Sequence, residues 1–201
     1  MAFVVASILI ELTPGPNMGY LAVVSATHGR RTGYAATLGI GLGLLIVGMA
    51  TALGLATLIA SSRVLYETLR WAGVAYLLWL AWEAWRTADG APPDQVEREN
   101  DATFFRRGLI TNLLNPKAVV FFVAVLPTFI DASGRVLGQT VLLSVTYVGI
   151  ATILHAMIVT LAGTARHLLL AEPHFALLFR RGLALGLAGI AIWFAVGTAQ
   201  A

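Results

Sequence analysis

The sequence predicts an all-α integral membrane protein, in which six transmembrane helices form two inverted three-helix repeats and the first and fourth helices are broken. Three observations lead to this prediction. Hydrophobic residues make up 58% of the 201-residue chain and charged residues 11%, with a mean hydropathy of +0.82, which is more apolar surface than one soluble core of this size can hide. Six apolar runs have the length of a bilayer crossing, and two of these runs contain a proline break.

A helix needs about 20 mainly apolar residues to cross a bilayer. The expected spans are residues 2–25, 34–60, 69–85, 108–130, 137–165 and 182–198. The first span also contains Val24-Ser25-Ala26, a small-residue pattern that loosely fits a signal-peptide cleavage site. Because no Lys or Arg precedes this span, and Glu11 and two prolines interrupt it, we expect the span to be retained.

The longest hydrophilic stretch, residues 87–107, divides the six spans into three plus three. We therefore expect a first three-helix repeat at residues 1–86, a hydrophilic cytoplasmic linker at 87–107 and a second three-helix repeat at 108–201. An odd number of helices in each half means that the two halves insert in opposite orientations, as in many secondary transporters.

The arginines predict the orientation, because they are unevenly distributed over the connections between spans. Three alternate connections hold nine of them, at Arg30, Arg31, Arg86, Arg98, Arg106, Arg107, Arg166, Arg180 and Arg181. The other two connections hold three, at Arg63, Arg70 and Arg135. Since the arginine-rich side of a membrane protein is usually cytoplasmic, both termini are expected outside.

The break in the first span is the segment ELTPGPN, residues 11–17. Proline lacks an N–H and clashes with the carbonyl four residues earlier, so Pro14 and Pro16 are expected to free the carbonyls of Ile10 and Leu12. The glycine between the prolines permits the backbone to bend. A freed carbonyl is costly in hydrocarbon, so this break must face protein or a water-filled cavity.

The fourth span has a matching break in the segment NLLNPKA, residues 112–118, which also contains the only lysine of the chain. Here Pro116 is expected to free the carbonyl of Asn112, while the Asn112 and Asn115 amides re-satisfy exposed backbone groups. A single kink is usually a packing device. Paired breaks at corresponding positions of two repeats are typical of a transporter binding site.

Three ionisable residues are expected near the middle of the bilayer: Glu11, Lys117 and His155. Charges at this depth are expensive, and they usually line a pathway or pair with one another. One interpretation is that Glu11 and Lys117 only neutralise each other and hold the helices together. His155 is either a hydrogen-bonded buried side chain or part of a proton relay.

Several classes of site and partner are excluded or disfavoured. The chain has no cysteine, so it has no disulfide and no thiolate metal site, and no cofactor or metal is expected. The net charge of +3 and the pI near 9.7 come from arginines at helix ends rather than on one face, so nucleic acid is not an expected partner. Gly39 and Gly43 form a GxxxG pattern that permits close helix contact within one chain or in a homo-oligomer.

The sequence resembles the LysE/RhtB family of bacterial amino-acid exporters nearly from end to end. The resemblance rests on TPGPN at residues 13–17, the Gly-rich second span, WAGVAYLLWL at 71–80, and NLLNPKA at 112–118 followed by two phenylalanines and Pro127. It implies a six-helix protein of the bacterial inner membrane that exports amino acids or close derivatives, driven by the proton motive force. The chain has Pro127-Thr128-Phe129 where the family usually has PQF, and Glu11 and His155 vary against the family pattern.

We therefore expect a secondary active exporter of amino acids or close derivatives that works by proton-coupled antiport, with a site at the membrane midplane between the two broken helices. The expected substrate-binding residues are Thr13, Pro14, Gly15, Pro16, Asn17, Asn112, Asn115, Pro116 and Lys117. The proton-coupling candidates are Glu11 and His155. An exporter of a metal or other cation is the alternative, which the central lysine and the absence of cysteine disfavour. A membrane-embedded enzyme lacks any supporting motif, and a non-transporting scaffold leaves the paired breaks unexplained.

Overall fold

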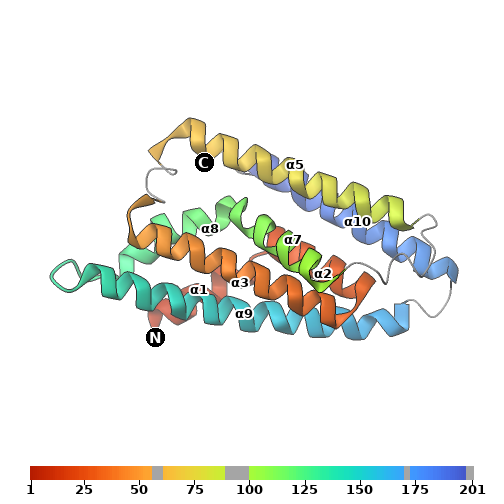
Figure 1. Cartoon of the computed structure of the whole chain (residues 1–201), viewed down its shortest axis with the longest axis horizontal. Helices are drawn as coiled ribbons and strands as arrows, with labels where there is room; N and C mark the ends of the chain where they lie inside the picture. Colours follow the sequence, from red (N-terminus) through yellow and green to blue (C-terminus); the bar gives the residue numbers. More distant parts are fainter. Residues whose placement is uncertain (56–60, 89–99, 170–172, 198–201) are drawn as a thin grey trace.

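The computed structural model describes residues 1–55, 61–88, 100–169 and 173–197, and none of these residues lies in a strand (Figure 1). Each expected span overlaps one helix or one broken pair, although residues 56–60 of the second span and residue 198 of the sixth lie outside the described residues. The α-helices are α1 (Ala2–Leu12), α2 (Pro16–His28), α3 (Arg30–Ala52), α5 (Arg63–Ala88), α7 (Asp101–Leu113), α8 (Pro116–Val120), α9 (Val136–Leu169) and α10 (Pro173–Gly197). The chain continues from α8 through a π-helical turn, η1 (Phe121–Val125), and a 3-10 turn, η2 (Leu126–Phe129).

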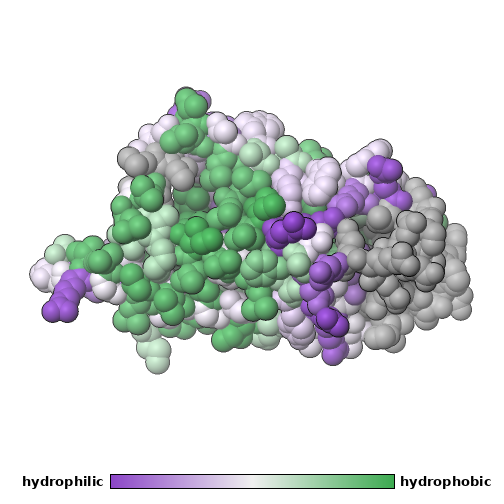
Figure 2. All heavy atoms as spheres, viewed as in Figure 1, coloured by the Kyte–Doolittle hydropathy of each residue, from purple (hydrophilic) through white to green (hydrophobic). Residues whose placement is uncertain are grey.

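Two of the described helices are long and apolar enough to cross a membrane, at Arg30–Ala52 and Val136–Ala165. A third crossing is added if Asp101–Leu113 and Pro116–Phe129, which meet at an angle of 52°, form one broken span. Many large apolar side chains on these helices point outward, including Leu38, Leu142 and Leu161. Figure 2 shows apolar side chains over the broad middle of the visible face and hydrophilic ones toward its ends, as expected for a multi-pass membrane protein.

The core forms where α3 packs against both α7 and α9, and α2 packs against both α9 and α3. The pair α5 and α10 lies alongside this group (Figure 1). Close packing of α3 on α7 depends on glycine, because a Cβ at Gly39 would collide with the carbonyl oxygen of Phe105 and a Cβ at Gly43 would press on Asn112. The GxxxG pattern therefore faces α7 of the same chain.

The stretch expected as a linker is bounded by helices that extend into it. Helix α5 continues to Ala88, and α7 begins at Asp101, where the Asn100 side chain accepts a hydrogen bond from the Ala102 N–H. Such a side-chain cap satisfies one of the free N–H groups at a helix start. Residues 89–99 lie outside the described part of the chain.

Ion pairs gather the arginine-bearing helix ends on one side of the molecule. Arg31 at the start of α3 contacts Asp101 at the start of α7, with a distance of 2.8 Å between guanidinium nitrogen and carboxylate oxygen. Arg107 of α7 contacts Glu83 near the end of α5 at the same distance. The start of α3, the end of α5 and the start of α7 therefore lie on the same side of the molecule (Figure 1).

Candidate functional site

The first break lies between Leu12, where α1 ends, and Pro16, the first residue of α2. Proline suits this position because its missing N–H is one that a helix start leaves unpaired. The expectation of a free Ile10 carbonyl is wrong, since it accepts a hydrogen bond of 3.1 Å from the N–H of Thr13. The last hydrogen bond of α1 joins residues three apart instead of four. This bond satisfies the Ile10 carbonyl, to which Pro14 has no N–H to donate.

The second break repeats this geometry between Leu113, where α7 ends, and Pro116, the first residue of α8. The Asn112 carbonyl, also expected to be free, accepts a hydrogen bond of 2.9 Å from the N–H of Asn115. Of the two amide side chains expected to satisfy exposed backbone groups, Asn115 does so, because it accepts a hydrogen bond of 3.0 Å from the N–H of Lys117. The Asn112 side chain instead accepts a hydrogen bond from Asn17. Both breaks therefore consist of a tightened turn followed by a helix that starts with proline.

Two hydrogen bonds join the breaks to each other. The Asn17 amide nitrogen of α2 donates to the Asn112 side-chain oxygen of α7 at 2.9 Å, and both side chains are buried. The Lys117 ammonium of α8 donates to the carbonyl oxygen of Thr13 at 2.7 Å. Segments about 100 residues apart in the chain thus meet at the point where each helix is interrupted.

The Asn17–Asn112 contact leaves two buried polar atoms without a hydrogen-bond partner among the described residues, Asn17 Oδ1 and Asn112 Nδ2. A buried polar atom of this kind costs about 1–3 kcal/mol. One is an acceptor and the other a donor, and Asn17 lines the pocket described below. The Asn17 oxygen is therefore available to a donor that enters the pocket.

Glu11 lies in the last turn of α1 with 5% of its surface exposed. The Tyr147 hydroxyl donates a hydrogen bond to Glu11 Oε1, and His155 Nε2 lies 3.2 Å from Glu11 Oε2. Glu11 and Lys117 line the same pocket, but no hydrogen bond joins their side chains in the described part of the chain. The carboxylate turns toward α9, and the ammonium takes the Thr13 carbonyl.

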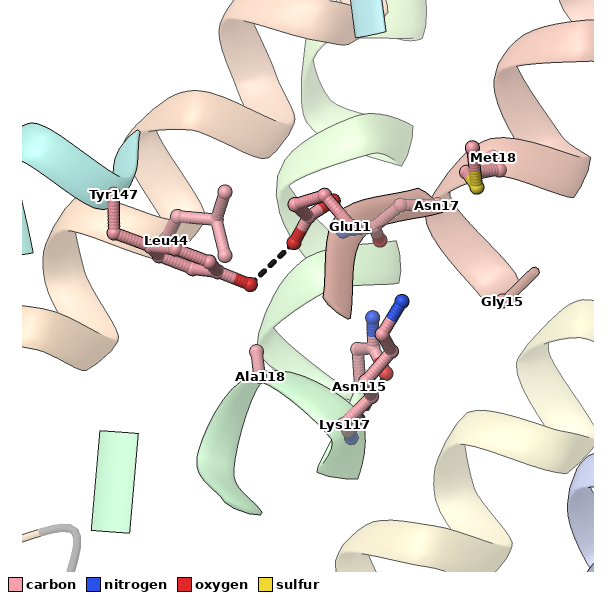
Figure 3. A pocket seen from close by; sticks show the side chains of 9 residues that line it. All are labelled: Glu11, Gly15, Asn17, Met18, Leu44, Asn115, Lys117, Ala118 and Tyr147. Carbon is pink, nitrogen blue, oxygen red and sulfur yellow. Dashed lines mark hydrogen bonds between the residues drawn. The ribbon is translucent and has the colours of Figure 1, made fainter. Parts of the chain in front are cut away.

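A small pocket lies between the breaks, with an empty volume of about 260 Å³ that includes its open mouth (Figure 3). Its enclosed part has room for about one water molecule. The lining residues are Glu11, Gly15, Asn17, Met18, Leu44, Asn115, Lys117, Ala118 and Tyr147. A Cβ at Gly15 would lie 3.4 Å from Lys117 Cδ, an ordinary van der Waals contact, so the two breaks approach each other closely at this point.

The structure thus brings together Glu11, Gly15, Asn17, Asn115 and Lys117 around one pocket. The other expected site residues serve it less directly. Thr13 offers its backbone carbonyl, Asn112 holds Asn17, Pro16 and Pro116 start the two helices, Pro14 belongs to the turn, and His155 lies behind Glu11.

The sequence interpretation missed four lining residues, of which Tyr147 contributes a polar group. A signal for it exists in the sequence. Ser144, Tyr147, Ala151, His155 and Val159 recur every three or four residues along α9, and all five are buried. This spacing places Tyr147 and His155 on one inward stripe of the helix.

No cluster of three or more His, Cys, Asp or Glu side chains that suits a metal ion occurs in the described part of the chain. The charged groups of the pocket are instead one carboxylate and one ammonium, Glu11 and Lys117. This combination can meet a molecule that carries both an ammonium and a carboxylate group.

A model of the LysE type translocator family matches residues 8–198. The homoserine/homoserine lactone efflux protein of Salmonella typhi is 34% identical over 162 residues, which cover 80% of this chain and 79% of that protein. The leucine efflux protein of Enterobacter sp. (strain 638) is 30% identical over 165 residues, 80% of this chain and 77% of that protein. An uncharacterized membrane protein of Vibrio cholerae is 30% identical over 156 residues, 76% of this chain and 75% of that protein. No solved structure matches the chain.

Proposed function

The chain belongs to the LysE type translocator family, and from this membership we propose that it exports amino acids or close derivatives by proton-coupled antiport. Its relatives include proteins named for efflux of homoserine, homoserine lactone and leucine. The first and last of these compounds share an α-ammonium and a carboxylate and differ in the side chain. The proposed site therefore recognises the shared charged groups, and the substrate side chain lies against the apolar lining residues Met18, Leu44 and Ala118.

The observation that carries this proposal is the contact between Lys117 and the Thr13 carbonyl across the two breaks. An ammonium group near the middle of the membrane needs a partner. A backbone carbonyl is a weaker hydrogen-bond acceptor for it than a carboxylate, because a hydrogen bond between two charged groups is stronger. A substrate carboxylate takes the place of the Thr13 oxygen. The substrate ammonium then faces Glu11 and the unpartnered oxygen of Asn17, which lie across the same pocket (Figure 3).

The pocket must widen to admit an amino acid, since its enclosed part has room for about one water molecule. Release of Lys117 from Thr13 removes one of the two hydrogen bonds that join the breaks. Binding of substrate and separation of the two broken helices are therefore the same event in this proposal, which is the coupling that alternating access requires.

The helix contacts support the proposed inverted repeat. If the first three spans correspond in order to the last three, α1 matches α7 and α3 matches α9, so the packing of α3 on α7 is equivalent to the packing of α9 on α1. Both of these contacts occur, and α3 with α9 and α5 with α10 form the pairs that a two-fold axis relates to themselves. We propose that the two halves rock about this axis, with both termini outside a bacterial inner membrane.

Glu11 and His155 are the proposed proton carriers. Glu11 contacts both His155 and the pocket, so a proton on its carboxylate and a substrate ammonium in the pocket compete for the same group. When the substrate leaves on the outer side, Glu11 takes a proton, which is released inward after the halves have moved.

Efflux of labelled amino acids tests the proposed function. Cells that produce the protein and cells that carry the empty vector are loaded with a panel including homoserine, leucine, a basic and an acidic amino acid. The proposal predicts faster efflux of at least one amino acid, and slower efflux when a protonophore collapses the proton gradient. Equal efflux of the whole panel from both kinds of cell would reject it.

A further inference from the structure

Tyr147 of α9 contacts structural elements from both broken spans. Its hydroxyl donates to the Glu11 carboxylate at the end of α1. Its ring stacks on Phe121, with ring centroids 3.7 Å apart and an angle of 15° between the planes, and meets Phe122 edge to face at 5.4 Å. Only 1% of its surface is exposed, so these contacts fix the position of its hydroxyl.

Phe121 and Phe122 belong to η1, the π-helical turn that directly follows α8. A π-helical turn interrupts the regular hydrogen-bond ladder and often occurs at functional sites. Helix α8 is only five residues long and carries Lys117. A movement of Lys117 together with α8 is therefore transmitted through the adjoining turn to the two rings that hold Tyr147.

The surroundings of Glu11 make its charge sensitive to this hydroxyl. From α9 it is faced by Tyr147 and His155, and across the pocket by Asn17 of α2 and Lys117 of α8. Leu44, on the α3 side, is apolar. The hydroxyl donates to an ionised carboxylate in a charge-assisted hydrogen bond, which becomes a weaker neutral bond when the carboxylate takes up a proton.

His155 contacts the second oxygen of the Glu11 carboxylate, where it can exchange a proton with that group. Its Nε2 lies 3.2 Å from Glu11 Oε2, and both ring nitrogens are buried without a well-aligned hydrogen bond within the described parts of the chain. An imidazole can accept a proton on one nitrogen and release one from the other. Tyr147 therefore holds one carboxylate oxygen in place while the other faces the group that exchanges the proton.

We propose that Tyr147 is a positioning residue that links the Lys117 site to proton uptake by Glu11, through the stacking of its ring on Phe121. This inference rests on the proposed function of a proton-coupled exporter. When Glu11 is ionised, the hydrogen bond from the Tyr147 hydroxyl holds α1 against α9. When Glu11 is protonated, this hydrogen bond weakens, and Tyr147 moves together with η1 and α8 when Lys117 moves.

The test uses the purified protein in liposomes, preloaded with an amino acid that the efflux assay identifies. Export is measured as a function of pH for wild type and Tyr147→Phe, which keeps the ring and its stacking and lacks only the hydroxyl. Without its donor the carboxylate holds its proton to higher pH, so the pH of half-maximal export is expected to rise by about one unit or more. Tyr34→Phe is the matched control, because that hydroxyl contacts Thr160, and no shift is expected.

Two further comparisons separate a role through Glu11 from a general structural effect. In a Glu11→Gln background the Tyr147→Phe substitution is expected to add no shift, since the group it acts on cannot take up a proton. Phe121→Leu is expected to shift the pH profile upward by less than Tyr147→Phe, because the hydroxyl remains and only loses its fixed position. Phe129→Leu is the control for Phe121→Leu, because the Phe129 ring packs on Phe3.

The outcomes distinguish the two proposals. If wild-type protein exports no amino acid, the proposed function fails. If wild type exports and Tyr147→Phe follows the wild-type pH profile, the role of Tyr147 is wrong and the function stands. If Tyr147→Phe does not fold, the Phe121→Leu profile decides, and an unshifted profile for that variant overturns the proposal.

Discussion

Asn17 of α2 and Asn112 of α7 form a buried hydrogen bond of 2.9 Å, in which the Asn17 amide nitrogen donates to the Asn112 side-chain oxygen. With the bond from Lys117 to Thr13, it joins the two interrupted helices at the level of their breaks. One contact is made by neutral side chains and the other by a charge. In the proposed mechanism a substrate carboxylate replaces the lysine contact, while the Asn pair stays in place.

The first prediction concerns the hydrogen bond between Asn17 and Asn112. Asn17→Ala and Asn112→Ala are each expected to lower the free energy of unfolding in detergent by about 1–3 kcal/mol, because each leaves a buried amide without its partner. The double variant is expected to lose less than the sum of the two. Thermal or denaturant unfolding of the four proteins measures the coupling, and strictly additive losses would show that the bond contributes nothing.

The second prediction concerns the two helix starts. Pro16→Ala and Pro116→Ala restore an N–H that can extend the preceding helix, so each is expected to reduce efflux about tenfold or more while the protein still reaches the membrane. Pro173→Ala, at the start of α10 away from the breaks, is the control. Normal efflux by both break variants would reduce the breaks to packing kinks.

The third prediction concerns the packing of α3 on α7. A Cβ at Gly39 collides with the backbone of Phe105, so Gly39→Ala is expected to lower stability by about 1–3 kcal/mol. Gly149 of α9 has nothing within 4 Å of an added Cβ, and Gly149→Ala is expected to be neutral or slightly stabilising. Melting temperatures in detergent compare the two, and equal values would contradict the packing.

The fourth prediction concerns orientation. Single cysteines are introduced at Asp94, which lies outside the described residues, and at Ser133, which is exposed between η2 and α9. The arginine distribution predicts that an impermeant thiol reagent labels Ser133→Cys in intact cells, and Asp94→Cys only after the membrane is opened. Labelling of Asp94→Cys in intact cells would show that the topology is the reverse of the expected one.

The helices and their two interruptions were predictable because their causes are local. Apolar runs of fixed length mark the helices, and proline interrupts a helix when it stands in the interior of an apolar run, so Pro14, Pro16 and Pro116 predict both breaks from the sequence alone. The partner of Lys117 was not predictable, since the Thr13 carbonyl reaches it only through the approach of two distant segments. Tyr147 was missed for a similar reason, because its hydroxyl has a role only once α1 brings Glu11 against α9.

The most direct test of the proposed site is a competition measurement on liposomes that contain the purified protein. Uptake of a labelled amino acid substrate in exchange for internal substrate is measured in the presence of the unlabelled amino acid or of its uncharged carboxamide. The account predicts that the carboxamide competes at least about tenfold more weakly for wild type, and that Lys117→Met, in whatever exchange remains, loses this preference. An undiminished preference for the carboxylate in Lys117→Met would contradict the central role of Lys117.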